Sequence, residues 1–337
     1  MTAAGGAACH LLGSTSLFAD PTHISGTDIP RNADCPIPFD KNIRDRMWMW
    51  GHDSGSLEYY IPKEKGGRIL PAAAIKSMGI PNVCMVPFTG TPHPTEYDVY
   101  ARQFNDPAIK RFTWSFIHGS AQSANEIKAA ALRQAAKYTN FVGLDMDDFF
   151  KGNADPSQEG AKTAPIPAES AVDPQDEANK SRAISPAALS PDQVTEVQKE
   201  LHTFAPKCRG RKLDLSIVWY THQLHPSIKR HIDAVDVVYL WTWNANHLVD
   251  LERNFKAFRD ICPDVRIRLG IYMWNFDNKA EIPLELMKHQ LDCAHRWLIS
   301  GEVEGLIFHC TPLCDMKLEA VDFSRRWIDR HGEEDVK

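Results

Sequence analysis

Residues 141–148 read Phe-Val-Gly-Leu-Asp-Met-Asp-Asp, and this stretch decides how the rest of the chain is interpreted. Apolar side chains alternate with glycine and aspartate, which is the two-residue period of a β-strand with two different faces. The apolar face consists of Val142, Leu144 and Met146. Asp145 and Asp147 therefore point to the opposite side. Buried carboxylates are costly there unless they are paired or take part in chemistry, so both are candidate functional residues.

Similar short apolar runs recur along the chain, and a helical pattern follows each of them. The predicted strands are 46–52, 83–88, 112–118, 141–149, 213–220, 237–243, 267–274 and 305–310. The predicted helices are 71–78, 96–104, 125–138, 191–204, 227–234, 247–262, 283–300 and 318–331. Eight consecutive β/α pairs with right-handed crossovers predict an α/β fold, a single-domain (β/α)8 TIM barrel.

A doubly wound open sheet is the alternative fold. It would need a glycine-rich phosphate loop after the first strand, and residues 50–55, Trp-Gly-His-Asp-Ser-Gly, do not have the GxGxxG pattern. The barrel is therefore favoured.

Two segments do not follow the β/α repeat. Residues 1–40 are predicted to form an extended N-terminal arm that is partly disordered, which leaves 41–337 for the barrel. Residues 151–190 form a long Pro/Ala-rich insertion without a hydrophobic period. This insertion follows the fourth strand, so it emerges on the face where barrels carry their active sites. It is either a disordered segment without a role or a mobile lid.

The composition limits the classes of partner. The chain has 337 residues, of which 43% are hydrophobic, and 38 Lys+Arg against 44 Asp+Glu give a net charge of −6. Because there is no long basic run, we expect no nucleic-acid partner and no membrane surface. The eight cysteines contain no CxxC pair, which favours buried free thiols in a soluble, cytoplasmic protein, with export left open. The oligomeric state is not predicted.

Tryptophan is concentrated on the predicted strands. Seven of the nine tryptophans lie in strands or at strand ends, namely residues 48, 50, 114, 219, 241, 243 and 274. Aromatic faces pack against the C–H faces of sugars while nearby polar groups bind hydroxyls, so we expect a carbohydrate substrate. The predicted substrate-binding residues at the carboxyl ends of the strands are His52, Asp53, His118, Tyr220, His222, Trp241, Trp243, Tyr272, Trp274, Asn275 and His309.

The predicted catalytic residues are Asp145, Asp147 and Asp148. Glycoside hydrolysis needs one protonated carboxyl for the leaving group and one carboxylate as nucleophile or base. We assign the acid to Asp147, because neighbouring negative charges raise the pKa of one carboxyl in a cluster. Its partner is left open among Asp53, Asp148 and Asp277, or is a substrate acetamido group oriented by Tyr220 or Tyr272.

Residues 142–149 resemble the strand-four signature of chitinase-like glycoside hydrolases, Asp-Gly-x-Asp-x-Asp-x-Glu. Asp145 and Asp147 match its last two aspartates, whereas Val142 and Phe149 stand in place of the first aspartate and the catalytic glutamate. The region 47–328 also resembles uncharacterised bacterial barrel proteins, through GLDMDDFF, Trp-Thr-Trp and Gly-x-Tyr-Met-Trp in strands four, six and seven. These resemblances imply a glycosidase-like barrel more than they imply a particular activity.

Three functions stay open on the sequence alone. The first is a glycoside hydrolase that uses carboxylate acid/base catalysis and no cofactor or metal. The second is a non-catalytic carbohydrate-binding barrel, since Phe149 stands where the chitinase-like signature has its catalytic glutamate. The third is a metal-dependent hydrolase or sugar isomerase that would use His52, His118, Asp147, His222 and His309.

Overall fold

A computed structural model describes residues 39–58, 60–61, 67–118, 124–151, 185–186, 189–204 and 212–337. Most of the predicted N-terminal arm and most of the 151–190 insertion lie outside these residues. The structural unit described below belongs to Ala33–Lys337.

Eight parallel strands close into a barrel in the order β1-β10-β9-β8-β7-β4-β3-β2. The strands are β1 Met47–Gly51, β2 Asn82–Met85, β3 Arg111–His118, β4 Phe141–Asp147, β7 Asp214–Tyr220, β8 Val237–Trp241, β9 Arg266–Tyr272 and β10 Gly305–His309. The ladder closes where Met47 of β1 pairs with Leu306 of β10. The predicted barrel is confirmed, and each predicted strand overlaps an observed one.

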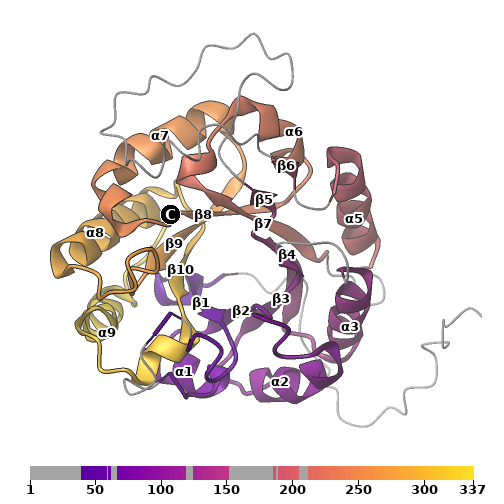
Figure 1. The fold of residues 1–337 in the computed structure, drawn as a ribbon, viewed down its shortest axis with the longest axis horizontal. Helices are drawn as coiled ribbons and strands as arrows, with labels where there is room; N and C mark the ends of the chain where they lie inside the picture. The colour runs from indigo at the N-terminus through magenta and orange to yellow at the C-terminus, as the bar shows by residue number, and fades with distance from the viewer. Residues whose placement is uncertain are drawn as a thin grey trace, which may run out of the picture. The chain divides into compact units, whose positions relative to one another are not determined.

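Helices surround the barrel, as Figure 1 shows. In the described part of the chain they are α1 Pro71–Met78, α2 Tyr97–Phe104, α3 Ala124–Lys137, α5 Pro191–Thr203, α6 Lys229–Ile232, α7 Leu251–Ile261, α8 Leu284–Ser300 and α9 Glu319–His331. Local sequence fixes several of their ends. Ser190 and Gln193 form a capping box at the start of α5, and Gly301 ends α8 with φ of 79°.

Two helices are shorter than the sequence predicts. Residues before α6 and α7 form the 3-10 turns Pro226–Ile228 and Ala245–Asp250 instead of regular α-helix. In both turns the preceding side chain, His225 or Asn244, accepts a hydrogen bond from a backbone N–H two residues later. Such local bonds compete with helical ones, so the helix begins later.

The insertion contains a pairing that its composition does not reveal. Phe150–Lys151 (β5) pairs antiparallel with Ser185–Pro186 (β6), with Phe150 opposite Pro186 and Lys151 opposite Ser185. The two ends of the insertion therefore lie next to each other, close to the end of β4.

Of the described cysteines, Cys84, Cys262, Cys293, Cys310 and Cys314 are free and buried. The helices of the described residues include none with the length and apolar character needed to cross a bilayer.

Candidate functional site

A pocket lies at the carboxyl ends of the barrel strands, where β1, β4, β7, β8, β9 and β10 end. It has a volume of about 70 Å³. Its lining residues are Trp50, His52, Leu57, Tyr60, Phe88, Asp147, Asp148, Tyr220, Trp241, Trp243, Tyr272, Phe276 and His309. Aromatic rings dominate this wall, and the two aspartates supply its carboxylates.

The indole of Trp241 lies directly against the backbone of β9. A Cβ atom added at Gly270 would come within 1.9 Å of the Trp241 ring, so this position needs glycine. The ring centroid of Trp241 is 5.4 Å from that of Trp50 and 5.0 Å from that of Tyr272. Three rings from β1, β8 and β9 thereby form one aromatic wall.

The pocket carboxylates come from the end of β4. Asp147 is the last residue of that strand and is 5% exposed. Asp148 has φ of 45°, an uncommon value for a residue other than glycine, and its N–H donates to Asp147 Oδ1 at 2.9 Å. The Tyr220 hydroxyl donates to Asp148 Oδ1 at 2.7 Å. Neighbouring aspartates are therefore held in the pocket with different partners.

Tyr220 keeps its proton at neutral pH. Burial, followed by the negative charge of Asp148, raises the pKa of Tyr220 well above its ordinary value. Its hydroxyl is thus a stable donor that fixes the orientation of Asp148.

Two histidines from the ends of β1 and β10 face the same pocket. His52 Nδ1 lies 3.0 Å from the carbonyl oxygen of Val86, and the His52 backbone exchanges two hydrogen bonds with the Thr311 hydroxyl. The His309 ring lies 4.6 Å from Phe276 and 5.6 Å from His52, between centroids. Burial, with a smaller contribution from His52, lowers the pKa of His309 well below its ordinary value, so the ring is neutral at pH 7.

Two buried polar atoms of the lining have no partner in the described protein. They are Nε1 of Trp241 and Nδ1 of His309. Buried polar atoms are nearly always hydrogen-bonded, and leaving one unpaired costs about 1–3 kcal/mol. Both atoms have almost no accessible surface, so a molecule in the pocket would reach them only if neighbouring side chains moved.

Asp145 lies deeper in the barrel than the pocket. It is fully buried, accepts hydrogen bonds from the hydroxyls of Thr113 and Tyr239, the latter at 2.6 Å, and is absent from the pocket lining. Arg268 donates to the Tyr239 hydroxyl at 3.1 Å and pairs with Glu304. Burial raises the pKa of Asp145, and the hydrogen bonds from Thr113 and Tyr239 oppose part of that rise. Asp145 belongs to a polar network in the barrel core.

The pocket brings together eight of the residues predicted from sequence: His52, Asp147, Asp148, Tyr220, Trp241, Trp243, Tyr272 and His309. The others lie elsewhere. Asp53 accepts a hydrogen bond from the N–H of Ser54, His222 is exposed and stacks on Tyr220, and Trp274 is buried away from the lining.

Asn275 is buried beside the turn that follows β9 and exchanges backbone hydrogen bonds with Ala280. Asp277, a candidate second carboxylate, accepts a hydrogen bond from Asn244 at the exposed surface. The side chain of His118 lies outside the described residues.

Sequence reasoning missed part of the lining. Leu57, Tyr60 and Phe276 come from loops after β1 and β9, and Phe88 lies beyond the end of β2. Strand alternation does not extend into loops, so it gives no direction for these side chains. The available signal was their position just after strand ends, where barrel active sites are built.

No set of three ligand-type side chains in the described pocket has its donor atoms within 4.8 Å of one another. The described residues do contain such a group elsewhere, formed by His295, His331 and Glu334. The described pocket residues therefore do not support the hypothesis of a metal site in the pocket.

The fold and the pocket define a class of protein, a (β/α)8 barrel with an acidic, aromatic pocket at the carboxyl ends of its strands. No protein-family model matches the chain, and no similar sequence is found among curated proteins.

Solved structures share the fold. Catalytic-site mutants of active domain 2 of chitinase from Pyrococcus furiosus align with a TM-score of 0.50 and 12% identity, over 88% of this chain and 97% of that chain. A plant class V chitinase mutant from Cycas revoluta in complex with (GlcNAc)3 gives 0.49 and 10%, over 83% and 98%. A GH5_18 from Bifidobacterium longum subsp. infantis gives 0.49 and 11%, over 86% and 80%. The first likeness shows the same barrel fold, as the sequence resemblance implied.

Proposed function

We propose that the protein is a glycoside hydrolase whose active site is the aromatic pocket at the end of β4. The observation that carries the proposal is that Asp147 and Asp148 face a pocket walled by tryptophan and tyrosine. Aromatic faces beside carboxylates suit a sugar ring and the acid/base chemistry of glycosidic bond cleavage.

In this proposal Asp147 is the general acid and protonates the leaving oxygen. Asp148, held by the Tyr220 hydroxyl, is the carboxylate that activates water or supports a substrate acetamido group. Neutral His309 stacks with Trp50 and helps to exclude water from the inner wall.

The test is hydrolysis of a panel of aryl glycosides and oligosaccharides by the wild type and by Asp147→Asn. We expect kcat to fall at least about 100-fold, because an amide cannot donate the proton. Asp277→Asn is the matched control, since Asp277 is an exposed carboxylate bonded to Asn244, and it should keep wild-type kcat. Equal turnover by wild type and Asp147→Asn would falsify the assignment.

One observation favours a second function, carbohydrate binding without turnover. Phe149 stands where the resembled chitinase motif has its catalytic glutamate, and its ring is fully buried against Phe150 and His231. Calorimetric titration with the same oligosaccharides separates the two functions. Binding that Trp243→Ala abolishes, with no product after long incubation, would establish the binding function instead.

A further inference from the structure

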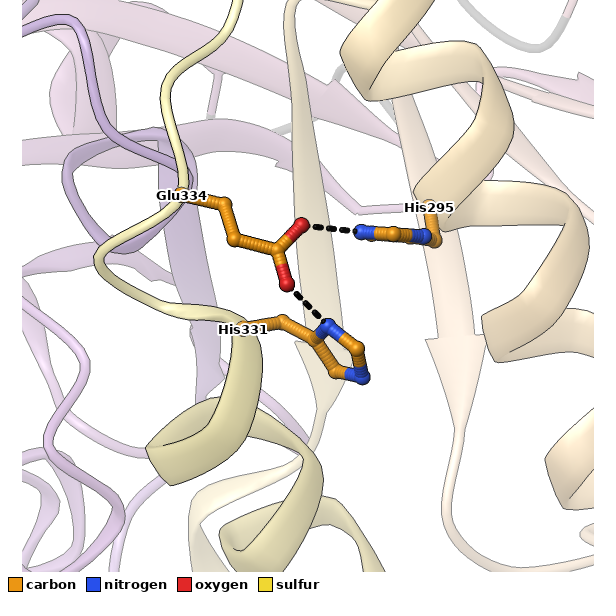
Figure 2. A group of neighbouring side chains, drawn as sticks. All are labelled: His295, His331 and Glu334. Carbon is orange, nitrogen blue, oxygen red and sulfur yellow. Dashed lines mark hydrogen bonds and ion pairs between the residues drawn. The ribbon is translucent and has the colours of Figure 1, made fainter.

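We propose that His295, His331 and Glu334 form a binding site for a zinc-type divalent cation on the outside of the barrel, separate from the pocket. Figure 2 shows the three side chains converging, with both rings turned toward the carboxylate. His295 Nε2 lies 2.7 Å from Glu334 Oε2, and His331 Nδ1 lies 2.5 Å from Glu334 Oε1. All three donor atoms lie within 4.8 Å of one another.

The donor set selects the class of cation. Two imidazole nitrogens and one carboxylate oxygen suit Zn²⁺, which binds three protein ligands and a water in open tetrahedral sites. Mg²⁺ and Ca²⁺ prefer oxygen ligands alone. At Zn–ligand distances of about 2.0–2.2 Å, the ligand atoms of a tetrahedral site lie roughly 3.3 Å apart. The two N–O pairs, now 2.7 Å and 2.5 Å apart, would therefore have to separate by roughly 0.6–0.8 Å to act as ligands of one ion.

The side chains are accessible, yet their backbones are fixed. His295, His331 and Glu334 are 28%, 21% and 40% exposed, so an ion and its water can reach them. The Glu334 carbonyl accepts a hydrogen bond from the N–H of Ile43 at 2.9 Å, and its N–H donates to the His331 carbonyl at 3.0 Å. The site is thus preorganised at the level of the main chain, and Glu334 can adjust through its side chain.

Aromatic packing holds the two imidazoles near each other. The His295 and His331 rings lie 4.6 Å apart between centroids, and Trp327 lies 5.9 Å and 5.1 Å from them. An ion bound here would link α8, the end of α9 and the C-terminal residues that pair with the segment before β1. Its role would be to fasten the chain end to the barrel.

The experiment uses the full chain after chelator treatment, titrated with Zn²⁺ by calorimetry at a fixed neutral pH. We expect one site with a dissociation constant of about 10 µM or tighter, and at least a tenfold loss of affinity in His295→Asn and in Glu334→Gln. His289→Asn is the matched control, because His289 is on the same helix outside the cluster, and it should bind as the wild type does.

Two further measurements separate metal binding from folding and from the pocket. The melting temperature of each variant is measured with and without Zn²⁺. The shift caused by Zn²⁺ then reports metal binding even where the substitution lowers the stability of the metal-free protein. His52→Asn should retain the zinc affinity, since His52 belongs to the pocket. Unchanged affinity in His295→Asn, or a loss of affinity in His52→Asn, overturns the proposal.

Discussion

At the scale of single residues, Asp145 and Asp147 show what strand alternation can and cannot predict. Alternation predicts correctly that both side chains face the barrel axis, and the hydrogen bond from Tyr239 to Asp145 confirms this for the deeper residue. Alternation does not give depth. Two residues span about 6.6 Å along a strand. That distance places Asp145 in the polar network of the core and Asp147 in the pocket lining.

This placement predicts a structural role for Asp145. Asp145→Ala removes the acceptor of two buried hydroxyl groups, from Thr113 and Tyr239, so the free energy of unfolding should fall by about 2–5 kcal/mol. Asp145→Asn keeps one carbonyl acceptor and should lose less. Urea unfolding of the two variants measures both values. A loss below about 1 kcal/mol in Asp145→Ala would show that the network does not depend on this carboxyl.

At the scale of elements, the strands were predictable because each combines an apolar run with turn residues at its ends. Strands β4, β8 and β9 nevertheless end two residues before the predicted limits, at Asp147, Trp241 and Tyr272. Beyond these residues the chain leaves the barrel to build the pocket wall. Apolar composition continues past that point, so sequence alone extends the strands too far.

Packing between β8 and β9 gives an element-scale prediction. In Gly270→Ala the new methyl group would overlap the Trp241 indole, which must then move out of the aromatic wall. We expect a loss of about 1–3 kcal/mol in urea unfolding, the usual cost of overpacking. The double variant Gly270→Ala/Trp241→Leu restores the space and should recover part of that loss. If the single variant is as stable as the wild type, the Trp241 indole can make room for a methyl group at position 270 without cost.

At the scale of the whole molecule, the order of elements predicts the barrel because few topologies accommodate eight β/α units with right-handed crossovers. The site is less predictable. Strand alternation predicted pocket-lining residues on strands, such as Trp241 and His309. It did not predict Tyr60 and Phe276, which lie on loops. Loop conformation depends on tertiary contacts that no periodic pattern encodes.

The pairing of β5 with β6 gives the prediction for the 151–190 insertion. Lys151 and Ser185 are opposite each other, so a two-residue Asn-Gly turn can replace residues 152–184 and close a β-hairpin. Shortening the loop lowers the entropic free-energy cost of closing it by roughly 2 kcal/mol, because each halving of loop length lowers that cost by about 0.6 kcal/mol. We therefore expect a folded variant whose free energy of unfolding, measured with urea, equals or exceeds that of the wild type.

A Gly/Ser linker of the original length in place of residues 152–184 is the control for this replacement. It keeps the length of the loop but removes its side chains, so the wild type and the linker variant should have the same free energy of unfolding if those side chains do not support the barrel. If instead both variants lose more than about 2 kcal/mol, the insertion packs on the barrel through its own residues. A loss confined to the Asn-Gly variant would mean that β5 and β6 cannot accept so tight a connection.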